Sequence, residues 1–232
     1  MLFQVARVHV CRRLSCWDRA SALQKCFISY DAHHLCFHLS LQLFDSSLRS
    51  ALQRICNSGF SDSQWLQASL SVRDGGLRVR RVSSLALPAY LASAASTLSL
   101  QNEILSGCAG SEDTFFQTYL LSWSDSFGDV PESLPAKQSI WDRPGIAADR
   151  ALVESNLSTS FQLASFRAAS SPHSGDWLFA LPISPCGLCL DDEAVRIAVS
   201  VRLGMAICVP HNCHCGSLVD AHGLHSFVCR KA

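Results

Sequence analysis

Cysteine and histidine residues crowd together near the carboxyl end of the chain. Residues 208–229 read CVPHNCHCGSLVDAHGLHSFVC. Within this segment two cysteines have the spacing C-x-C, and a histidine and a cysteine lie four residues apart. Structural zinc takes four ligands in a tetrahedron, drawn from Cys sulfur and His nitrogen. The spacing therefore predicts a structural zinc (Zn2+) site with four ligands: Cys213, Cys215, His225 and Cys229.

Two local geometries would bring these ligands to one ion. In an extended segment Cys213 and Cys215 point to the same side, and the neighbouring Gly216 permits a sharp bend. On a helical turn His225 and Cys229 share one face. Four protein ligands leave no open position, so the site is expected to give structure rather than catalysis. Three nearby side chains are alternatives for a member of the set: Cys208, His211 and His222.

The competing interpretation is a set of reduced, unliganded cysteines on a loose tail. The chain holds 12 cysteines, and those in helical-looking segments are expected to behave as small buried hydrophobes. Residues 204–232 contain little apolar material, so a metal ion is the expected source of order there. Structural zinc in short fingers contributes roughly 10–16 kcal/mol at neutral pH, which favours the metal site.

Two further patterns have simpler explanations. Cys186 and Cys189 have the spacing of a redox motif, but no thioredoxin-like strand and helix surround them. The pair Asp191-Asp192 is similar to the paired aspartates that hold Mg2+ in polymerases. This pair, however, opens a helix, where carboxylates favour the positive end of the helix dipole. We therefore interpret it as a helix cap.

The elements that must position these residues are mainly helices. Apolar residues recur at intervals of three or four, a pattern typical of one face of a helix. A capping residue, Ser61 or Asp62, is expected to start a short helix that contains Trp65. The other expected helices are 32–57 (with a break near Ser46 and Ser47), 82–96, 146–169 and 194–203. The sequence thus predicts a mainly α protein, with irregular helical domains and a small C-terminal zinc-finger segment.

The 232 residues suffice for one ordinary domain or two small ones. Three prolines fall within 122–145, which indicates a linker. The predicted organisation is a helical region, a linker, a second helical segment and the finger: 1–123, 124–145, 146–204 and 205–232. No stretch is apolar enough to span ~30 Å of hydrocarbon, and no targeting signal is recognised. We therefore expect no membrane contact and an intracellular location, nuclear or cytoplasmic.

Positive charge is concentrated at two places, although the formal net charge is zero. One is the segment 73–81, and the other follows the last predicted zinc ligand. A local basic strip attracts phosphate even when the whole chain is neutral. A solvated arginine face is the alternative. The candidate nucleic-acid-binding residues are Arg73, Arg78, Arg80, Arg81, Arg230 and Lys231.

Longer stretches carry a family likeness. FDSSLRSALQRICNSGFSDSQWLQASLSVRDGGLRVRRVSSLALPAYLASAAS (44–96) resembles the segment after the polymerase core in non-LTR retrotransposon reverse transcriptases of animals. SPHSGDWLFALPIS (171–184) and LDDEAVRIAVSVRLG (190–204) resemble the next part of those polyproteins. CHCGSLVDAHGLHSFVC (213–229) resembles their Cys-Cys-His-Cys finger. The four stretches occur in the family's order and cover most of 35–232.

The resemblance implies a non-catalytic fragment whose region helps to hold template RNA or target DNA. It supports the four proposed ligands and disfavours Cys208 and His222. It supplies no catalytic residue, because the polymerase's aromatic-x-Asp-Asp motif is absent and the sequence ends at Ala232 before a nuclease motif. No enzyme activity and no small-molecule substrate are expected. Two positions depart from the family pattern: Ser71 stands where Pro is usual, and Arg78 where Gly is usual.

Two other functions are compatible with the same residues. The chain would be a zinc-stabilised protein-interaction module if it made no nucleic-acid contact, or a decayed, non-functional reading frame. The position of the arginines in 73–81 discriminates between nucleic-acid binding and protein interaction. A continuous basic face shared with the finger would favour nucleic acid, whereas pairing with Asp or Glu would favour protein interaction.

Overall fold

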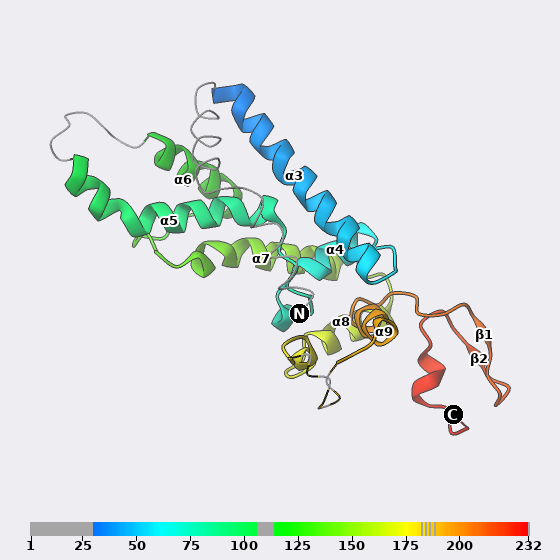
Figure 1. Ribbon diagram of the computed structural model, residues 1–232. Coiled ribbons are helices and arrows are strands. Elements are labelled where there is room, and N and C mark those ends of the chain that lie inside the picture. Colours follow the sequence, from blue (N-terminus) through cyan, green and yellow to red (C-terminus); the bar gives the residue numbers. More distant parts are fainter. Residues whose placement is uncertain are drawn as a thin grey trace. The chain divides into compact units, whose positions relative to one another are not determined.

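A computed structural model describes residues 30–105, 114–181, 183, 185, 187 and 189–231. Helices make up most of this part of the chain, and the strands are two short ones near the C-terminus (Figure 1). The prediction of a mainly α protein is therefore confirmed. None of the described helices is long and apolar enough to cross a membrane. The α-helices are α3 (Tyr30–Ile55), α4 (Asp62–Ser69), α5 (Val82–Leu105), α6 (Thr114–Phe127), α7 (Gln138–Ser155), α8 (Ser160–Ala169) and α9 (Asp192–Arg202).

The chain divides into two compact units. The first contains α3 and residues 176–199, and the second contains residues 59–175 and 200–232. In the first unit α3 is continuous, so the predicted break near Ser46 and Ser47 is wrong. The hydroxyls of these two serines donate to the carbonyls four residues earlier, at 2.9 Å each, and so add hydrogen bonds without interrupting the helix. The predicted cap of α9 is confirmed, because the Asp191 carboxylate accepts from the Ala194 N–H at 2.7 Å.

The predicted linker contains more regular structure than a linker would. Helix α6 extends to Phe127, and α7 begins at Gln138. The Trp141 side chain is fully buried, and it meets Trp123 edge to face with 5.2 Å between ring centroids. The Trp123 indole N–H donates to the Trp141 carbonyl at 3.2 Å, and the Trp141 indole N–H donates to the Pro135 carbonyl at 2.7 Å. This tryptophan pair anchors the Pro-rich segment to the core of the second unit.

A tight turn after α4 is the second feature of this unit. Ser61 and Gln64 form a capping box that starts α4, as the sequence predicts for Ser61. The Leu77 N–H and the Arg78 N–H donate back to the carbonyls of Ala68 and Leu70. Gly75 adopts a left-handed φ of +84° in this turn. Asp74, Gly75 and Gly76 thus form a tight turn between α4 and the segment that follows it.

Arg202, the last residue of α9, holds this turn from the other side. Its guanidinium is buried and donates to three backbone carbonyls, those of Val72, Gly76 and Ser174. The Gln67 amide donates to the carbonyls of both Gly75 and Arg202. Burial lowers the pKa of the Arg202 guanidinium. The root of the C-terminal segment is thus fixed to the helical body at Arg202.

Replacing Gly76 by alanine should destabilise this turn strongly. A Cβ at Gly76 would lie 2.2 Å from the Leu70 carbonyl oxygen and 2.5 Å from that of Gln67. Backbone atoms cannot rotate away, so we expect Gly76→Ala to cost about 3 kcal/mol of unfolding free energy in urea titration. The matched control is Gly59→Ala, where a Cβ meets nothing within 4 Å. Equal stability of the two variants would contradict the packing at Gly76.

Candidate metal centre

The first two candidate ligands lie in the turn of a β-hairpin. Strands β1 (His211–Asn212) and β2 (Leu218–Val219) pair antiparallel, with His211 opposite Val219. The Cys213 N–H donates to the Ser217 carbonyl at 2.9 Å, and the Gly216 N–H donates to the Cys213 carbonyl at 2.8 Å. Gly216 has a φ of +91°, which glycine adopts without strain. The predicted bend at Gly216 is confirmed.

The expected extended conformation of Cys213 and Cys215 is wrong. Both residues lie within the closed turn, and the strand pairing ends at Asn212. The hydrogen bonds between Cys213 and Gly216 or Ser217 replace the strand ladder there. The turn nevertheless directs the two sulfurs to one side, as an extended segment would. Cys213 and Cys215 therefore still belong to one group of donor atoms.

Of the other two candidate ligands, His225 lies within a short 3-10 helix, η4 (Leu224–Phe227), and Cys229 follows this helix. Gly223 precedes it with a φ of +67°, and the Asp220 carboxylate accepts from the Leu224 N–H at 3.1 Å. The Cys229 N–H donates to the His225 carbonyl at 2.9 Å. This hydrogen bond spans four residues, as in an α-helical turn, and it places His225 and Cys229 on one face as predicted.

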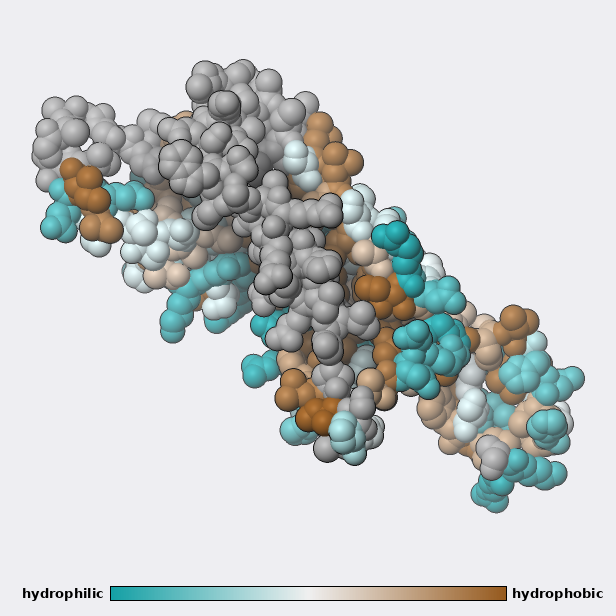
Figure 2. Space-filling view, in the orientation of Figure 1, coloured by the Kyte–Doolittle hydropathy of each residue, from teal (hydrophilic) through white to brown (hydrophobic). Residues whose placement is uncertain are grey.

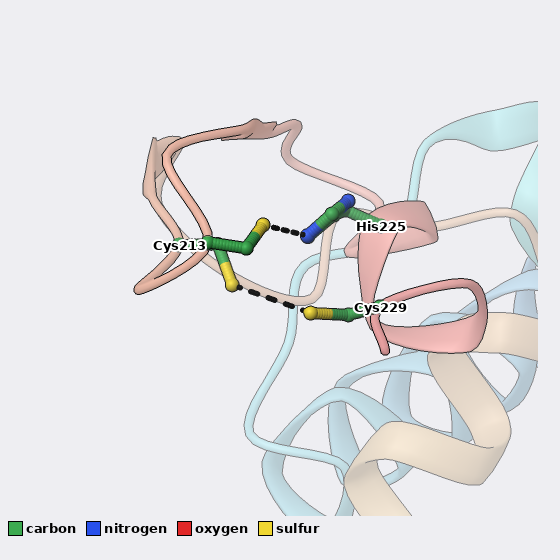
Figure 3. Close-up of side chains that lie close together, drawn as sticks. Cys213, His225 and Cys229 are labelled. Carbon is green, nitrogen blue, oxygen red and sulfur yellow. Dashed lines mark hydrogen bonds between the residues drawn. The ribbon is translucent and has the colours of Figure 1, made fainter. Parts of the chain in front are cut away.

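The hairpin turn and η4 bring the four donor atoms together. Cys213, His225 and Cys229 point toward one another (Figure 3). The Cys213 and Cys229 sulfurs are 3.7 Å apart, and the Cys215 sulfur is 3.0 Å from Nε2 of His225. All four donor atoms, from Cys213, Cys215, His225 and Cys229, lie within 4.8 Å of one another. The group could therefore hold a metal ion.

The spacing can be compared with that of a tetrahedral zinc site. Zn–S bonds of ~2.3 Å and Zn–N bonds of ~2.0 Å place two sulfurs about 3.8 Å apart and a sulfur and nitrogen about 3.5 Å apart. The sulfur–sulfur distance between Cys213 and Cys229 agrees with this requirement. The contact between Cys215 and His225 is shorter and would open by about half an ångström on coordination. The donor set fits the ion.

The three alternative ligands are engaged elsewhere. The Cys208 thiol donates to the Asp220 carbonyl at 3.3 Å. The His211 ring nitrogen Nδ1 lies 2.9 Å from the Val209 carbonyl, within its own strand segment. Nδ1 of His222 lies 3.2 Å from the Met205 carbonyl. None of the three belongs to the group of four donor atoms.

His222 instead connects the finger to the helical part of the second unit. Its ring packs against Phe161 of α8, with 5.5 Å between ring centroids. The Ile207 N–H donates to the Ala221 carbonyl at 2.7 Å, which closes the root of the finger. Hydrophobic and hydrophilic side chains both face solvent around this end of the chain (Figure 2). The finger is therefore tied to the body at its root, and many of its other side chains are exposed.

Two cysteines of the cluster, Cys215 and Cys229, differ in acidity. Hydrogen bonds from the Ser217 hydroxyl and backbone N–H lower the pKa of the Cys215 thiol to about 6. A hydrogen bond from the Lys231 N–H acts to lower the pKa of Cys229, but desolvation and the neighbouring cysteines raise it overall. The pKa of Cys215 is therefore lower than that of Cys229, and Cys215 presents an anionic sulfur at lower pH than Cys229 does.

The arginines of 73–81 do not form a free basic strip. Arg80 pairs with the buried carboxylate of Asp142 at 3.2 Å, and Arg81 pairs with Asp149 at 2.5 Å. Arg73 and Arg78 are exposed. Burial raises the pKa of Asp142, and Arg80 opposes this rise. Two of the predicted phosphate contacts are thus occupied by aspartates.

At the end of the chain Arg230 and Lys231 are exposed and directly follow the candidate ligand Cys229.

Sequence reasoning missed the structural role of Arg202 and Gln67, which fix the root of the finger. No sequence signal identifies them, because their partners are backbone carbonyls far along the chain.

Comparisons with known proteins returned no matching family model, no matching curated protein and no matching solved structure.

The low pKa of Cys215 predicts a pH-dependent thiolate in the metal-free chain. As pH rises through about 6, this thiol should lose its proton first, which ultraviolet thiolate absorbance would record. Cys215→Ser should remove that step, and Ser217→Ala should move it to higher pH. The control Cys208→Ser should leave it unchanged. A low-pH step that persists in Cys215→Ser would contradict the assignment.

Proposed function

We propose that the chain is a non-catalytic, zinc-binding fragment of a retrotransposon-derived reverse transcriptase, whose C-terminal finger contacts RNA or DNA. The observation that carries the zinc proposal is the convergence of three sulfurs and one imidazole nitrogen within 4.8 Å. Thiolate sulfur and imidazole in a tetrahedron are the ligands that structural zinc takes. Because the protein would supply all four ligands, the site leaves no position for substrate or reactive water.

Backbone conformation supports the family assignment at the two positions that depart from the family pattern. Arg78 has a φ of +60°, a left-handed conformation that glycine adopts freely and other residues adopt at a cost. Glycine is the residue expected there in the family. Ser71 has a φ of −64°, which is the value that proline fixes. Both departures thus occur where the backbone suits the expected residue.

The exposed basic residues support nucleic-acid contact. Arg230 and Lys231 extend from the candidate metal cluster, and Arg73 and Arg78 are also exposed. The ion pairs of Arg80 and Arg81 favour the alternative, a zinc-stabilised protein-interaction module. The exposed finger residues Val209 and Phe227, at 82% and 70%, would suit such a module as well. We therefore assign nucleic-acid binding to the exposed members of the candidate set: Arg73, Arg78, Arg230 and Lys231.

Metal analysis tests the zinc site directly. The full-length chain purified with zinc should carry one ion, because its four ligands form a single closed set. Cys213→Ser and Cys229→Ser should each lose the ion, since a hydroxyl is a poor replacement for a thiolate. Cys208→Ser is the matched control and should retain it. A parent chain without zinc, or zinc retained by both ligand variants, would refute the site.

Filter binding across a salt series tests the nucleic-acid contact. Each phosphate contact with a single strand contributes about 0.7 to the slope of log affinity against log salt. The double variant Arg230→Ala/Lys231→Ala should therefore lower the slope for single-stranded RNA by about 1.4. Arg143→Ala/Arg167→Ala removes equal charge from exposed residues of α7 and α8 and should change it less. Absence of binding even at low salt would leave the protein-interaction module as the better proposal.

A further inference from the structure

Two sulfurs of the candidate metal cluster are close enough to form a disulfide. The sulfurs of Cys213 and Cys229 are 3.7 Å apart, whereas a disulfide bond measures about 2.0 Å. The two sulfurs therefore need to approach by less than ~2 Å. Cys213 belongs to the hairpin turn and Cys229 follows η4, so the approach only tightens an existing contact. Both residues are partly exposed, which leaves them accessible to a small oxidant.

The other pairings within the cluster are less favourable. A bond between Cys213 and Cys215 would close a ring across a single intervening residue, which strains disulfide geometry. The Cys215 sulfur is already engaged with Nε2 of His225 at 3.0 Å. A bond between Cys213 and Cys229 closes a longer loop, and in the chain-entropy model a disulfide stabilises the fold more as its loop lengthens.

We propose that Cys213 and Cys229 are an oxidation site, at which hydrogen peroxide forms a disulfide and expels the bound ion. Release of the ion rests on the proposed zinc-binding function, whereas formation of the disulfide does not. Forming the disulfide removes two of the four ligands. The remaining pair, Cys215 and His225, cannot enclose an ion tetrahedrally.

The chemistry balances with peroxide as the oxidant. The thiolate sulfur of one cysteine attacks a peroxide oxygen, the O–O bond breaks, and a sulfenic acid and hydroxide form. The thiolate of the other cysteine then attacks the sulfenic sulfur. The S–S bond forms as the S–O bond breaks and a second hydroxide leaves. The two sulfurs together lose two electrons, which the two peroxide oxygens accept.

The test uses the full-length chain in two states. The zinc-loaded chain is titrated with peroxide while a chromogenic chelator records released zinc, and differential alkylation with peptide mass spectrometry maps the disulfides. We expect a Cys213–Cys229 disulfide, release of one zinc per disulfide formed, and recovery of zinc binding after reduction. The metal-free chain, treated in the same way, should form the same disulfide.

Two variants keep both reacting sulfurs. Cys208→Ser and Cys215→Ser should still form the Cys213–Cys229 disulfide, the first with zinc release and the second in the metal-free state. A disulfide between other cysteines, or none, in both states of the parent would overturn the proposal. Failure of the parent to bind zinc would instead refute the zinc function, while disulfide mapping of the metal-free chain would still decide the oxidation site.

Discussion

The finger cannot be held together by hydrophobic burial. Among the described residues after Arg202, the buried hydrophobic side chains are Leu203 and Met205, at the junction with α9, and Val219 of the hairpin. Other apolar side chains of this segment face solvent, with Val228 74% exposed. A segment this small and this open does not offset its conformational entropy by packing. Ligand bonds to a metal ion at the candidate cluster would act where the hairpin turn and η4 meet, and would supply the missing free energy.

The finger is nevertheless attached to the helical part of the second unit by specific contacts. Its root begins directly after Arg202, whose charged hydrogen bonds to the carbonyls of Val72, Gly76 and Ser174 lock it to the turn after α4. Each hydrogen bond to a charged group contributes about 1.5–3 kcal/mol, against which the burial of the guanidinium must be set. His222 adds a second tie through Met205 and Phe161. The candidate metal cluster is thus joined to a body that these hydrogen bonds hold at the point of attachment.

Local signals in the sequence predicted local features. The ligand spacing identified the cluster, and Ser61 and Asp191 were correctly predicted as helix caps, because each depends on residues within one or two turns of chain. Long-range features were missed for the opposite reason. The burial of Trp141 beside a Pro-rich stretch depends on Trp123 across a loop. Two of the carbonyls that Arg202 contacts, those of Val72 and Gly76, lie more than a hundred residues away. Composition indicated a linker at 124–145 but carried no signal for the burial of Trp141 within it.

The distribution of charge links the two halves of the proposed function. Aspartates of α7 neutralise Arg80 and Arg81, so the helical body offers less free positive charge than its sequence suggests. The charges of Arg230 and Lys231 are different, because these two exposed residues are the first two after the candidate ligand Cys229. Exposed charges act on phosphate only within about 8 Å at physiological salt. Under the proposed function, an ion that fixes Cys229 would therefore also fix where these two cations can meet a nucleic-acid strand, and loss of the ion would release both at once.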